Sequence, residues 1–470
     1  MSSRAQAWSA EPTPANDTRA SAVINPEAEF ALLGGLMIEN RLVDAVADRL
    51  APEDFSEPLA ARIFSAILHL VAQGQAANPI TLRPLLAGDP DMVEQPGFLA
   101  QLTGSSAALI GARDFADQIA ELANRRRLMT GLEAAVALAG DLHSPVAQVV
   151  DAADAAIVDA TIRRDPLHQP TGAECFDELL ASYGDPVKGV TCGQIEALDR
   201  VLGAIRPKQL IVAAGRPGMG KTAVALSYSI GAARGGQGVL FVSLEMGSTE
   251  LAGRMAADMC FDGRTGIPYQ DIRDGSLSND QLQRVCRARG EIADMPLYVV
   301  DAGSMTIGRL AMIVRRYKRR LAAKGQSLDL VVVDYLQLLS SDARGRSNYE
   351  TVSEVSRGLK AIAKDQSIGI LALAQLSRDV ERRPDKRPIM PDLRDSGQIE
   401  QDADGILFLF RLEYYLRQAE PDADTTEWSE WDHNLRQATG RIEFIVAKRR
   451  GGRTGTAMGS FLGEYQAVRS

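Results

Sequence analysis

The sequence has few of the residues from which metal centres and disulfide frameworks are built. Its four cysteines are widely spaced and form no C-x-x-C pair, and none of its four histidines is paired at ligand spacing. This pattern excludes a zinc motif and predicts reduced thiols. No apolar run approaches the roughly 18 residues of a membrane span, and no apolar segment follows Arg4. We therefore expect no secretory signal, no membrane partner and a cytoplasmic location.

The chain also lacks an excess of positive charge. It has 52 Lys and Arg against 61 Asp and Glu, a formal net charge of −9. This excludes a uniformly basic nucleic-acid coat, but a local basic channel stays possible because phosphate binding depends on where charges lie. At 470 residues the chain is too long for one typical core, so we expect two domains with linkers.

One strong phosphate-binding motif is present. Residues 215–222 fit G-x-x-x-x-G-K-[ST], with an apolar run before them and a helix-prone run after them. Backbone N–H groups of such a loop converge on a phosphate at the positive end of the helix. We expect Lys221 to reach the β- and γ-oxygens and Thr222 to hold Mg²⁺. The residues predicted to bind the nucleoside triphosphate are Gly215, Arg216, Pro217, Gly218, Met219, Gly220, Lys221 and Thr222.

The texture of the sequence changes along the chain. In the first third of the chain, apolar residues recur at helical spacing, and Asn25-Pro26 is expected to cap the first helix. A long helix is expected from Arg113 to Gly140, with the basic triplet 125–127 on its solvated side. The predicted divisions are a disordered tail at 1–25, an all-α domain at 26–141, a linker region with a short amphipathic helix at 142–190, and an α/β domain at 191–470. Unalternating apolar runs predict buried strands of a mostly parallel sheet at 210–214, 239–244, 297–301, 330–334, 368–374, 406–410 and 442–447.

Three of these strands end in polar residues suited to ATPase chemistry. Asp334 follows an apolar strand and is predicted to hold the Mg²⁺ shell. Glu245 closes another strand and is the candidate for orienting the attacking water; the alternative is a cap on the helix that starts near Ser248. Gln375 ends a third strand, where it can sense the γ-phosphate.

Basic residues follow two of these strands and end a fourth. Arg344 and Arg346 lie in the loop after Asp334, and a second basic loop follows Gln375. Both loops could track a phosphodiester backbone, or both could be solvated. The strand that ends at 448–450 could deliver an arginine finger to a neighbouring subunit, or it could form a solvated hairpin tip.

Together these segments resemble the bacterial replicative DNA helicases of the DnaB-like family. The resemblance runs from about Asn25 to the end of the chain. Its motifs are Gly215–Thr222, Ser243–Met246, Asp334–Leu338, Ser356–Lys360, Asp392–Asp404 and Ala447–Arg450, together with Glu27–Glu29, Leu32–Gly34 and Pro52–Phe55 in the helical region.

The resemblance implies a ring-shaped homohexamer with a RecA-like P-loop ATPase core, moving 5′→3′ on single-stranded DNA in the nucleoid. It implies primase and a helicase loader as partners. ATP and Mg²⁺ would bind between subunits, and the pore loop would hold DNA. The implied residues are Lys221, Thr222, Glu245, Asp334 and Gln375 from one subunit, Lys448 and Arg450 from the next, and Arg394, Asp395 and Gly397 at the DNA.

The chain also departs from that family. Asp395 stands where glutamate is usual, and the hairpin after Arg449 reads Arg-Gly-Gly-Arg-Thr-Gly in place of Arg-Asn-Gly-Pro-Thr-Gly. The stretch 413–440, with Trp428 and Trp431, has no assigned role. A RecA-like ATPase that acts as an assembly or timing scaffold without unwinding is the alternative function.

Overall fold

The computed structural model describes residues 23–89, 92, 97–104, 107–161, 171–183, 189–341, 348–393, 397–422 and 426–470. The chain divides into two compact units, residues 1–178 and 179–470, and each unit has its own hydrophobic core. Among the predicted site residues, Arg344, Arg346, Arg394 and Asp395 lie outside the described residues. No helix within the described ranges is long and apolar enough to cross a membrane.

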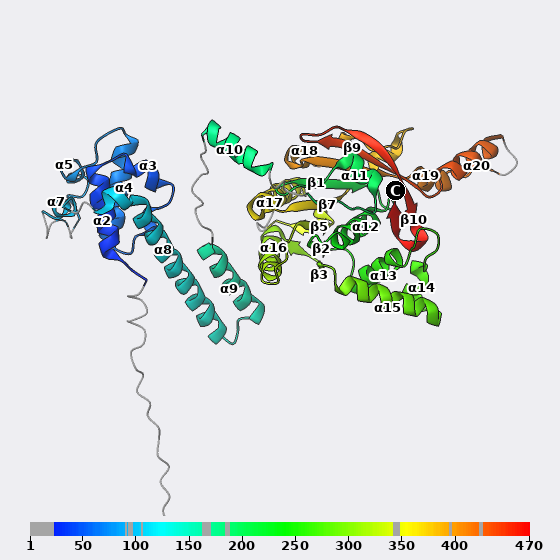
Figure 1. The fold of residues 1–470 in the computed structure, drawn as a ribbon, viewed down its shortest axis with the longest axis horizontal. Coiled ribbons are helices and arrows are strands. Elements are labelled where there is room, and N and C mark those ends of the chain that lie inside the picture. The colour runs from blue at the N-terminus through cyan, green and yellow to red at the C-terminus, as the bar shows by residue number, and fades with distance from the viewer. Residues whose placement is uncertain are drawn as a thin grey trace, which may run out of the picture. The chain divides into compact units, whose positions relative to one another are not determined.

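In its described residues the first unit has helices, joined by turns and short loops, and no strand (Figure 1). Its elements are α2 (Pro26–Ile38), α3 (Leu42–Ala47), the 3-10 turn η1 (Pro52–Asp54), α4 (Pro58–Ala72), α5 (Pro79–Leu82), α7 (Phe98–Leu102), α8 (Ala107–Gly140), α9 (Val146–Thr161) and most of α10 (Gly172–Ser182). The Asn25 side chain accepts a hydrogen bond from the Ala28 N–H (3.1 Å) and Pro26 opens α2, so the predicted cap is confirmed. The apolar faces of α2 and α4 are buried in one core.

The basic triplet 125–127 of α8 was predicted to lie on a solvated face, but only its first residue does so. Arg125 is exposed and pairs with an acid one turn before it (3.0 Å). In contrast, Arg126 donates to the backbone oxygen of Asp54, and Arg127 forms an ion pair with the Asp54 carboxylate. Two of the three cations therefore hold η1 against α8, a role that depends on an element some seventy residues away in the chain.

Helices α8 and α9 form a closely packed pair. A Cβ placed on Gly131 of α8 would lie 2.5 Å from the Cβ of Ala156 of α9, so the helices approach more closely than a larger residue allows. A helix at α9 is not among the elements expected from the sequence. The short amphipathic helix α10 was expected, and its apolar side chains Phe176 and Leu180 are 68% and 61% exposed.

The second unit alternates strands and helices. Its helices are α11 (Glu196–Leu202), α12 (Lys221–Arg234), α13 (Ser248–Met259), α14 (Tyr269–Asp274), α15 (Asn279–Ala293), α16 (Ile307–Ala322), α17 (Asn348–Gln366), α18 (Gly397–Asp402), α19 (Leu412–Gln418) and α20 (Thr426–Ala438), with 3-10 turns η2 (Leu336–Leu338), η3 (Arg378–Arg382), η4 (Met390–Asp392) and η5 (Gly463–Tyr465). Its strands are β1 (Leu210–Gly215), β2 (Val239–Ser243), β3 (Leu297–Asp301), β4 (Met305–Thr306), β5 (Leu330–Asp334), β6 (Leu339–Ser340), β7 (Gly369–Gln375), β8 (Gly405–Phe410), β9 (Arg441–Arg449), β10 (Gly455–Leu462) and β11 (Ala467–Arg469).

Nine of these strands form one sheet in the order β11-β10-β9-β8-β1-β7-β5-β2-β3. The six strands from β8 to β3 run parallel, and β9, β10 and β11 add antiparallel strands at one edge. Every residue of β1, β2, β5 and β8 is buried, as expected where helices cover both faces. The mostly parallel α/β fold and the positions of all seven predicted strands are confirmed, but β3, at the edge of the sheet, is only partly buried. Strands β4, β6, β10 and β11 were not predicted.

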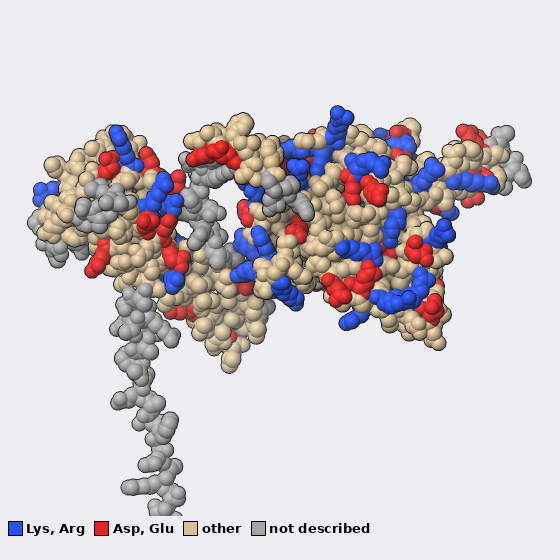
Figure 2. Space-filling model, in the orientation of Figure 1, with Lys and Arg blue, Asp and Glu red and all other residues tan. Residues whose placement is uncertain are grey.

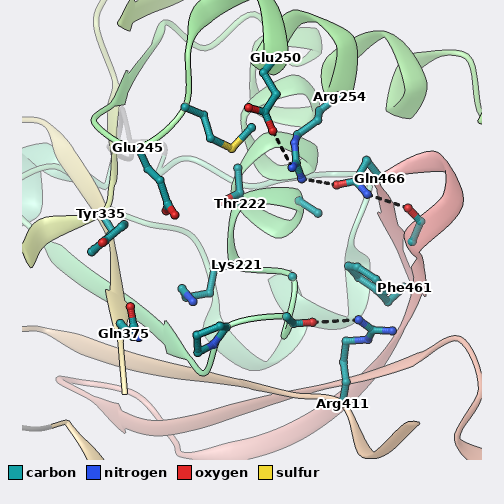
Figure 3. Close-up of a pocket in the computed structure, with 16 residues that line it drawn as sticks. Lys221, Thr222, Glu245, Glu250, Arg254, Tyr335, Gln375, Arg411, Phe461 and Gln466 are labelled. Carbon is teal, nitrogen blue, oxygen red and sulfur yellow. Dashed lines mark hydrogen bonds and ion pairs between the residues drawn. The ribbon is translucent and has the colours of Figure 1, made fainter. Parts of the chain in front are cut away.

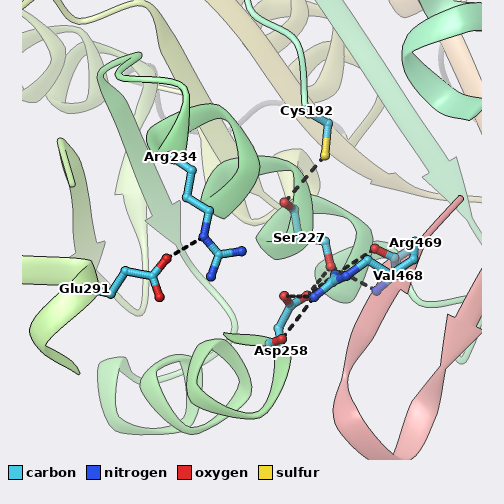
Figure 4. Close-up of polar contacts among 7 residues, drawn as sticks. All are labelled: Cys192, Ser227, Arg234, Asp258, Glu291, Val468 and Arg469. Carbon is cyan, nitrogen blue, oxygen red and sulfur yellow. Dashed lines mark hydrogen bonds and ion pairs between the residues drawn. The ribbon is translucent and has the colours of Figure 1, made fainter. Parts of the chain in front are cut away.

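The last strand is fastened to the domain by a buried ion pair (Figure 4). Asp258 of α13 is fully buried, and Arg469 of β11 donates to its carboxylate at 2.7 Å. Ser227 of α12 also donates to Asp258, and its hydroxyl oxygen accepts the Val468 N–H (3.1 Å). Because a buried carboxylate needs charge pairing and hydrogen bonds, these contacts fix β11 and the neighbouring η5 turn beside α13.

Candidate nucleotide site

The predicted phosphate loop connects β1 to α12 at the carboxyl edge of the parallel strands (Figure 3). Gly218 and Gly220 have φ of +80° and +88°, values that glycine adopts without strain. A Cβ on Gly218 would lie 2.6 Å from the Tyr414 ring, and one on Gly220 would clash with the Phe461 ring. Glycine is therefore required at both positions by backbone conformation and by space.

A pocket of about 630 Å³ opens in front of this loop. Five of the eight motif residues line it, namely Pro217, Gly218, Gly220, Lys221 and Thr222, together with Ala223, Glu245, Met246, Glu250, Arg254, Tyr335, Gln375, Arg411, Phe461, Gly463 and Gln466. The structure thus brings together residues from five strand ends and from the last forty residues of the chain.

Lys221 lies at the centre of the loop. Its Nζ donates to the carbonyl oxygens of Gly215 (3.0 Å) and Arg216 (3.3 Å). Burial lowers the pKa of the Lys221 ammonium, while the carboxylates of Asp334 and Glu245 raise it. The backbone oxygens are uncharged acceptors, so an anion in this pocket would interact with the Lys221 ammonium more strongly than they do.

Thr222 and Asp334 form the link between the loop and β5. The Thr222 hydroxyl donates to Asp334 Oδ2 at 2.7 Å, and Asp334 is only 1% exposed. Burial raises the pKa of the Asp334 carboxyl, and the Thr222 hydrogen bond and Lys221 act against that rise. A hydroxyl and a carboxylate side by side are oxygen ligands of the kind that Mg²⁺ takes in nucleotide sites.

Glu245 lies just beyond β2, and its carboxylate points into the pocket (Figure 3). The sequence left open a second role, that of a cap on α13. In the structure the first N–H of α13, that of Ser248, donates to Asp301 Oδ2 at 2.7 Å, and the cap residue Gly247 has no side chain. Asp301 therefore caps the helix, and Glu245 faces the pocket even though β7 and β5 separate β2 from β1.

Gln375 ends β7 directly beside the phosphate loop. It stands opposite Gly215 in the parallel register of β1 and β7. The Gln337 side chain brackets its backbone, donating to the Gln375 oxygen (3.2 Å) and accepting its N–H (3.3 Å). Because Gln337 belongs to η2, just after Asp334, this contact links the ends of β5 and β7.

Arg216 and Met219 are motif residues whose side chains do not line the pocket: Met219 is buried in the core, and Arg216 makes polar contacts elsewhere. The Arg216 Nε donates to Glu381 (2.8 Å) and its Nη1 donates to the Leu376 carbonyl (2.9 Å). The side chain is buried and ties the phosphate loop to the segment that follows Gln375. The Arg216 side chain is therefore not available to a ligand in the pocket.

Two arginines in the pocket were missed by sequence reasoning. Arg411 donates to the Gly218 carbonyl (3.0 Å), and its guanidinium carbon lies 3.8 Å from the centroid of the Phe461 ring. Arg254 of α13 donates to Gln466 (2.6 Å) and to Glu250 (2.9 Å). Burial lowers the pKa of Arg411. These residues come from distant segments, and no local spacing in the sequence connects them with the phosphate loop.

Lys448 and Arg450 lie at the opposite edge of the sheet. Strand β9 runs antiparallel to β8, so its last residue, Arg449, stands opposite Gly405, the first residue of β8. The parallel strands begin at this edge and end at the phosphate loop. The structure therefore does not bring Lys448 or Arg450 into the pocket of their own chain.

At that edge both cations contact the segment around α18. Lys448 donates to the backbone oxygen of Glu400, and Arg450 donates to the Asp404 carboxylate (3.2 Å) and to the Gln401 carbonyl (3.3 Å). Helix α18 begins at Gly397, one of the residues predicted to hold DNA. The predicted finger and the helix that follows the predicted DNA loop are thus in direct contact.

Comparison with protein families gives matches over both units. Residues 189–470 match the C-terminal domain of DnaB-like helicases, and residues 21–121 match their N-terminal domain. The replicative DNA helicase DnaB of Rickettsia prowazekii is 34% identical, covering 92% of this chain and 91% of its own length. That of Geobacillus stearothermophilus is 31% identical, covering 93% of each chain.

Solved structures give the same answer for the fold. A DnaB-like replicative helicase, studied for its interactions with primase, superposes with a TM-score of 0.68 at 26% identity, over 95% of this chain and 99% of its own. A second structure, of an isolated ATPase domain, superposes with a TM-score of 0.55 at 30% identity, over 64% of this chain and 99% of its own.

Proposed function

Since this chain belongs to the DnaB-like helicase family, we propose that it is an ATP-hydrolysing replicative DNA helicase that works as a homohexameric ring. The observation that carries the proposal is the division of the nucleotide chemistry between two edges of one sheet. The pocket with Lys221, Thr222 and Glu245 lies at one edge, and the cations Lys448 and Arg450 lie at the other. Such a site becomes complete only when copies associate head to tail.

Within one chain, the pocket supplies the phosphate-binding half of the site. Lys221 would neutralise charge on the β- and γ-phosphates, and Thr222 and Asp334 would hold Mg²⁺. The bound ion would offset the charge that builds up between the β- and γ-oxygens. The Arg411–Phe461 pair at the far side of the loop offers a flat wall suited to a nucleobase.

Hydrolysis requires a group that orients the attacking water. Glu245 is exposed, lines the pocket and does not cap α13, which supports a role in orienting the water. Gln375 lies beside Gly215 and leads into the segment that Arg216 ties to the loop. Loss of the γ-phosphate would thus change the contacts of Gln375 first, and then the position of the segment that follows it.

The neighbouring copy would complete the site with Lys448 and Arg450. To reach across, Arg450 must give up its contacts with Asp404 and Gln401 next to α18. Breaking or forming these contacts would couple the nucleotide state of one interface to the DNA loop of residues 394–397. In this role Arg394, Asp395 and Gly397 hold the backbone of single-stranded DNA, with Arg344 and Arg346 in a second loop.

The direction of movement, 5′→3′, and the partners, a primase and a helicase loader, complete the proposal. They rest on family membership, and so does the location in the cytoplasm at the nucleoid. The primase interaction is supported by the related helicase that was studied with primase.

Strand displacement is the test. Purified protein with ATP and Mg²⁺ is offered forked duplexes that carry a 5′ tail, a 3′ tail or both, and product strands are separated on a gel. Unwinding that depends on the 5′ tail is expected, with rings visible by electron microscopy. ATP hydrolysis stimulated by single-stranded DNA, but without displacement on any fork, would instead favour the scaffold ATPase.

A further inference from the structure

Asp404, at the amino edge of the sheet, is a buried carboxylate that contacts two cations. It follows α18 and precedes β8, and it is only 5% exposed. Its Oδ2 accepts the Leu210 N–H (2.9 Å) and the Lys360 ammonium (2.5 Å), whereas its Oδ1 accepts Arg450 Nη1 (3.2 Å). The cation proposed as a finger for the neighbouring copy therefore shares one carboxylate with a second cation of its own chain.

Asp404 holds these two cations with different strength. Lys360 makes the shorter contact, its Nζ also donates to the Lys208 carbonyl (2.9 Å), and its side chain is 27% exposed. Arg450 makes the longer contact, and its side chain is 59% exposed. Figure 2 shows Lys and Arg side chains at the surface over β9 and α18, where Arg450 follows β9. Because distance and solvent both weaken an ion pair, Arg450 is the more loosely held partner.

The position of Asp404 depends on neither of the two side chains. Its N–H donates to the Leu210 carbonyl (2.8 Å), and its carbonyl accepts the backbone N–H of Arg450 (2.6 Å). A buried carboxylate is strongly destabilised when its charge partner is removed. Here Lys360 and the Leu210 N–H stay in place when the Arg450 side chain leaves. The departure of Arg450 therefore leaves Asp404 both paired and hydrogen-bonded.

We propose that Lys360 is a positioning residue for the finger: by neutralising Asp404, it frees the Arg450 guanidinium to reach the nucleotide of the neighbouring copy. The inference rests on the proposed function, because the neighbour's site gives Arg450 its destination. Lys360 lies on α17 and does not line the nucleotide pocket of its own chain, so it acts through Asp404. Without Lys360, Arg450 would be the only cation in contact with this carboxylate among the described residues, and burial would retain it there.

Steady-state ATP hydrolysis by the full-length protein tests this role. Lys360→Met removes the charge and keeps the length of the side chain, so it should lower kcat roughly tenfold or more, with KM for ATP little changed. Lys360→Arg keeps the charge and should keep most of the rate. Lys364→Met is the matched control, since Lys364 is an exposed lysine one turn further along α17, and it should change neither constant. Electron microscopy of each variant checks that rings assemble.

The decisive variant combines Lys360→Met with Asp404→Asn. Removing the carboxylate charge releases Arg450 again, so the second change should recover most of the lost kcat, a strong departure from additivity. If the pair only stabilises the fold, a second change at the same buried contact should deepen the loss. Asp404→Asn alone should hydrolyse ATP at least as fast as the unmodified protein, and this variant serves as the test if Lys360→Met rings do not assemble.

Three results would overturn the inference: an unchanged kcat in Lys360→Met rings, no recovery in the double variant, or a lower kcat in assembled Asp404→Asn rings. Arg450→Ala in the same assay separates this inference from the proposed function. If Arg450→Ala is impaired, the shared nucleotide site stands and only the role of Lys360 falls. If Arg450→Ala hydrolyses ATP at the unmodified rate, Arg450 has no part in hydrolysis, and the shared site fails together with the inference.

Discussion

The two edges of the sheet in the second unit differ in how complete they are. At the carboxyl edge, four strand ends bring Lys221, Thr222, Glu245, Asp334 and Gln375 around one pocket of a single chain. At the amino edge, Lys448 and Arg450 are occupied with the backbone and carboxylate of the α18 segment. The carboxyl edge thus has a pocket that can hold a ligand, whereas the amino edge has cations but no part of that pocket. This difference supports the proposal that a single chain binds nucleotide and that hydrolysis requires a neighbouring subunit.

The largest effect is expected from removing the cation at the complete edge. Lys221→Ala should abolish ATP binding and hydrolysis, because the phosphates lose their charge partner in a desolvated pocket. Equilibrium binding of a fluorescent ATP analogue measures the first, and phosphate release measures the second. An unchanged unfolding midpoint shows that the fold is intact, and appreciable hydrolysis by such a protein would show that the pocket is not the ATP site.

At the other edge, Arg450→Ala should lower the hydrolysis rate by roughly 10³–10⁵, the range found for arginine fingers, while ATP binding largely persists. Arg453→Ala is the matched control, since Arg453 lies in the same hairpin and is exposed. An equal loss of rate in the control would mean that the hairpin acts through its shape and not through the Arg450 charge.

Glu245→Gln should retain ATP and slow its hydrolysis by roughly 10²–10⁴, the contribution of a positioned general base. Asp301→Asn is the control, because Asp301 ends the adjacent strand and an asparagine can still cap α13. Single-turnover hydrolysis separates retained binding from lost chemistry. If Glu245→Gln hydrolyses ATP at the rate of the unmodified protein, another group must orient the attacking water.

Mixed rings test whether the two edges meet. Arg450→Ala and Glu245→Gln subunits are each impaired alone, but some interfaces of a mixture pair an intact Glu245 with an intact Arg450. Part of the hydrolysis rate should therefore return when the two are co-assembled and the mixing is verified by mass spectrometry. If Arg450 acts within its own chain, every subunit has a defect and no mixture recovers.

The smallest effect is expected at the DNA loop. Arg394→Ala should make the plot of log affinity against log salt for single-stranded DNA shallower by about 0.7, the slope per phosphate contacted. Affinity should fall similarly for unrelated sequences, since a backbone contact carries no base information. Arg436→Ala, which removes an exposed cation paired with Asp432 on α20, is the control. An unchanged slope in Arg394→Ala would remove this loop from the DNA path.

Local sequence pattern predicted the elements well. Unalternating apolar runs predicted seven strands, and in β1, β2, β5 and β8 the reason is that a strand buried on both faces needs apolar residues at every position. The phosphate loop was also predictable, since its chemistry is encoded in eight consecutive residues and in the conformational freedom of Gly218 and Gly220. Asp334 and Gln375 were predicted as site residues because each directly ends an apolar strand.

Contacts between distant elements could not be predicted in the same way. Nothing near Arg126 indicates that Asp54 is its partner, and nothing near Glu245 shows that Asp301 takes over the cap of α13. Arg411 and Phe461 reach the phosphate loop only because β8 and the antiparallel strands lie beside β1 in the sheet. The sequence by itself determined seven of the strands and the position of the predicted phosphate loop, because these features depend on neighbouring residues. Tertiary structure decided that Lys448 and Arg450 lie across the sheet from that site, because strand order and direction depend on how the whole core packs.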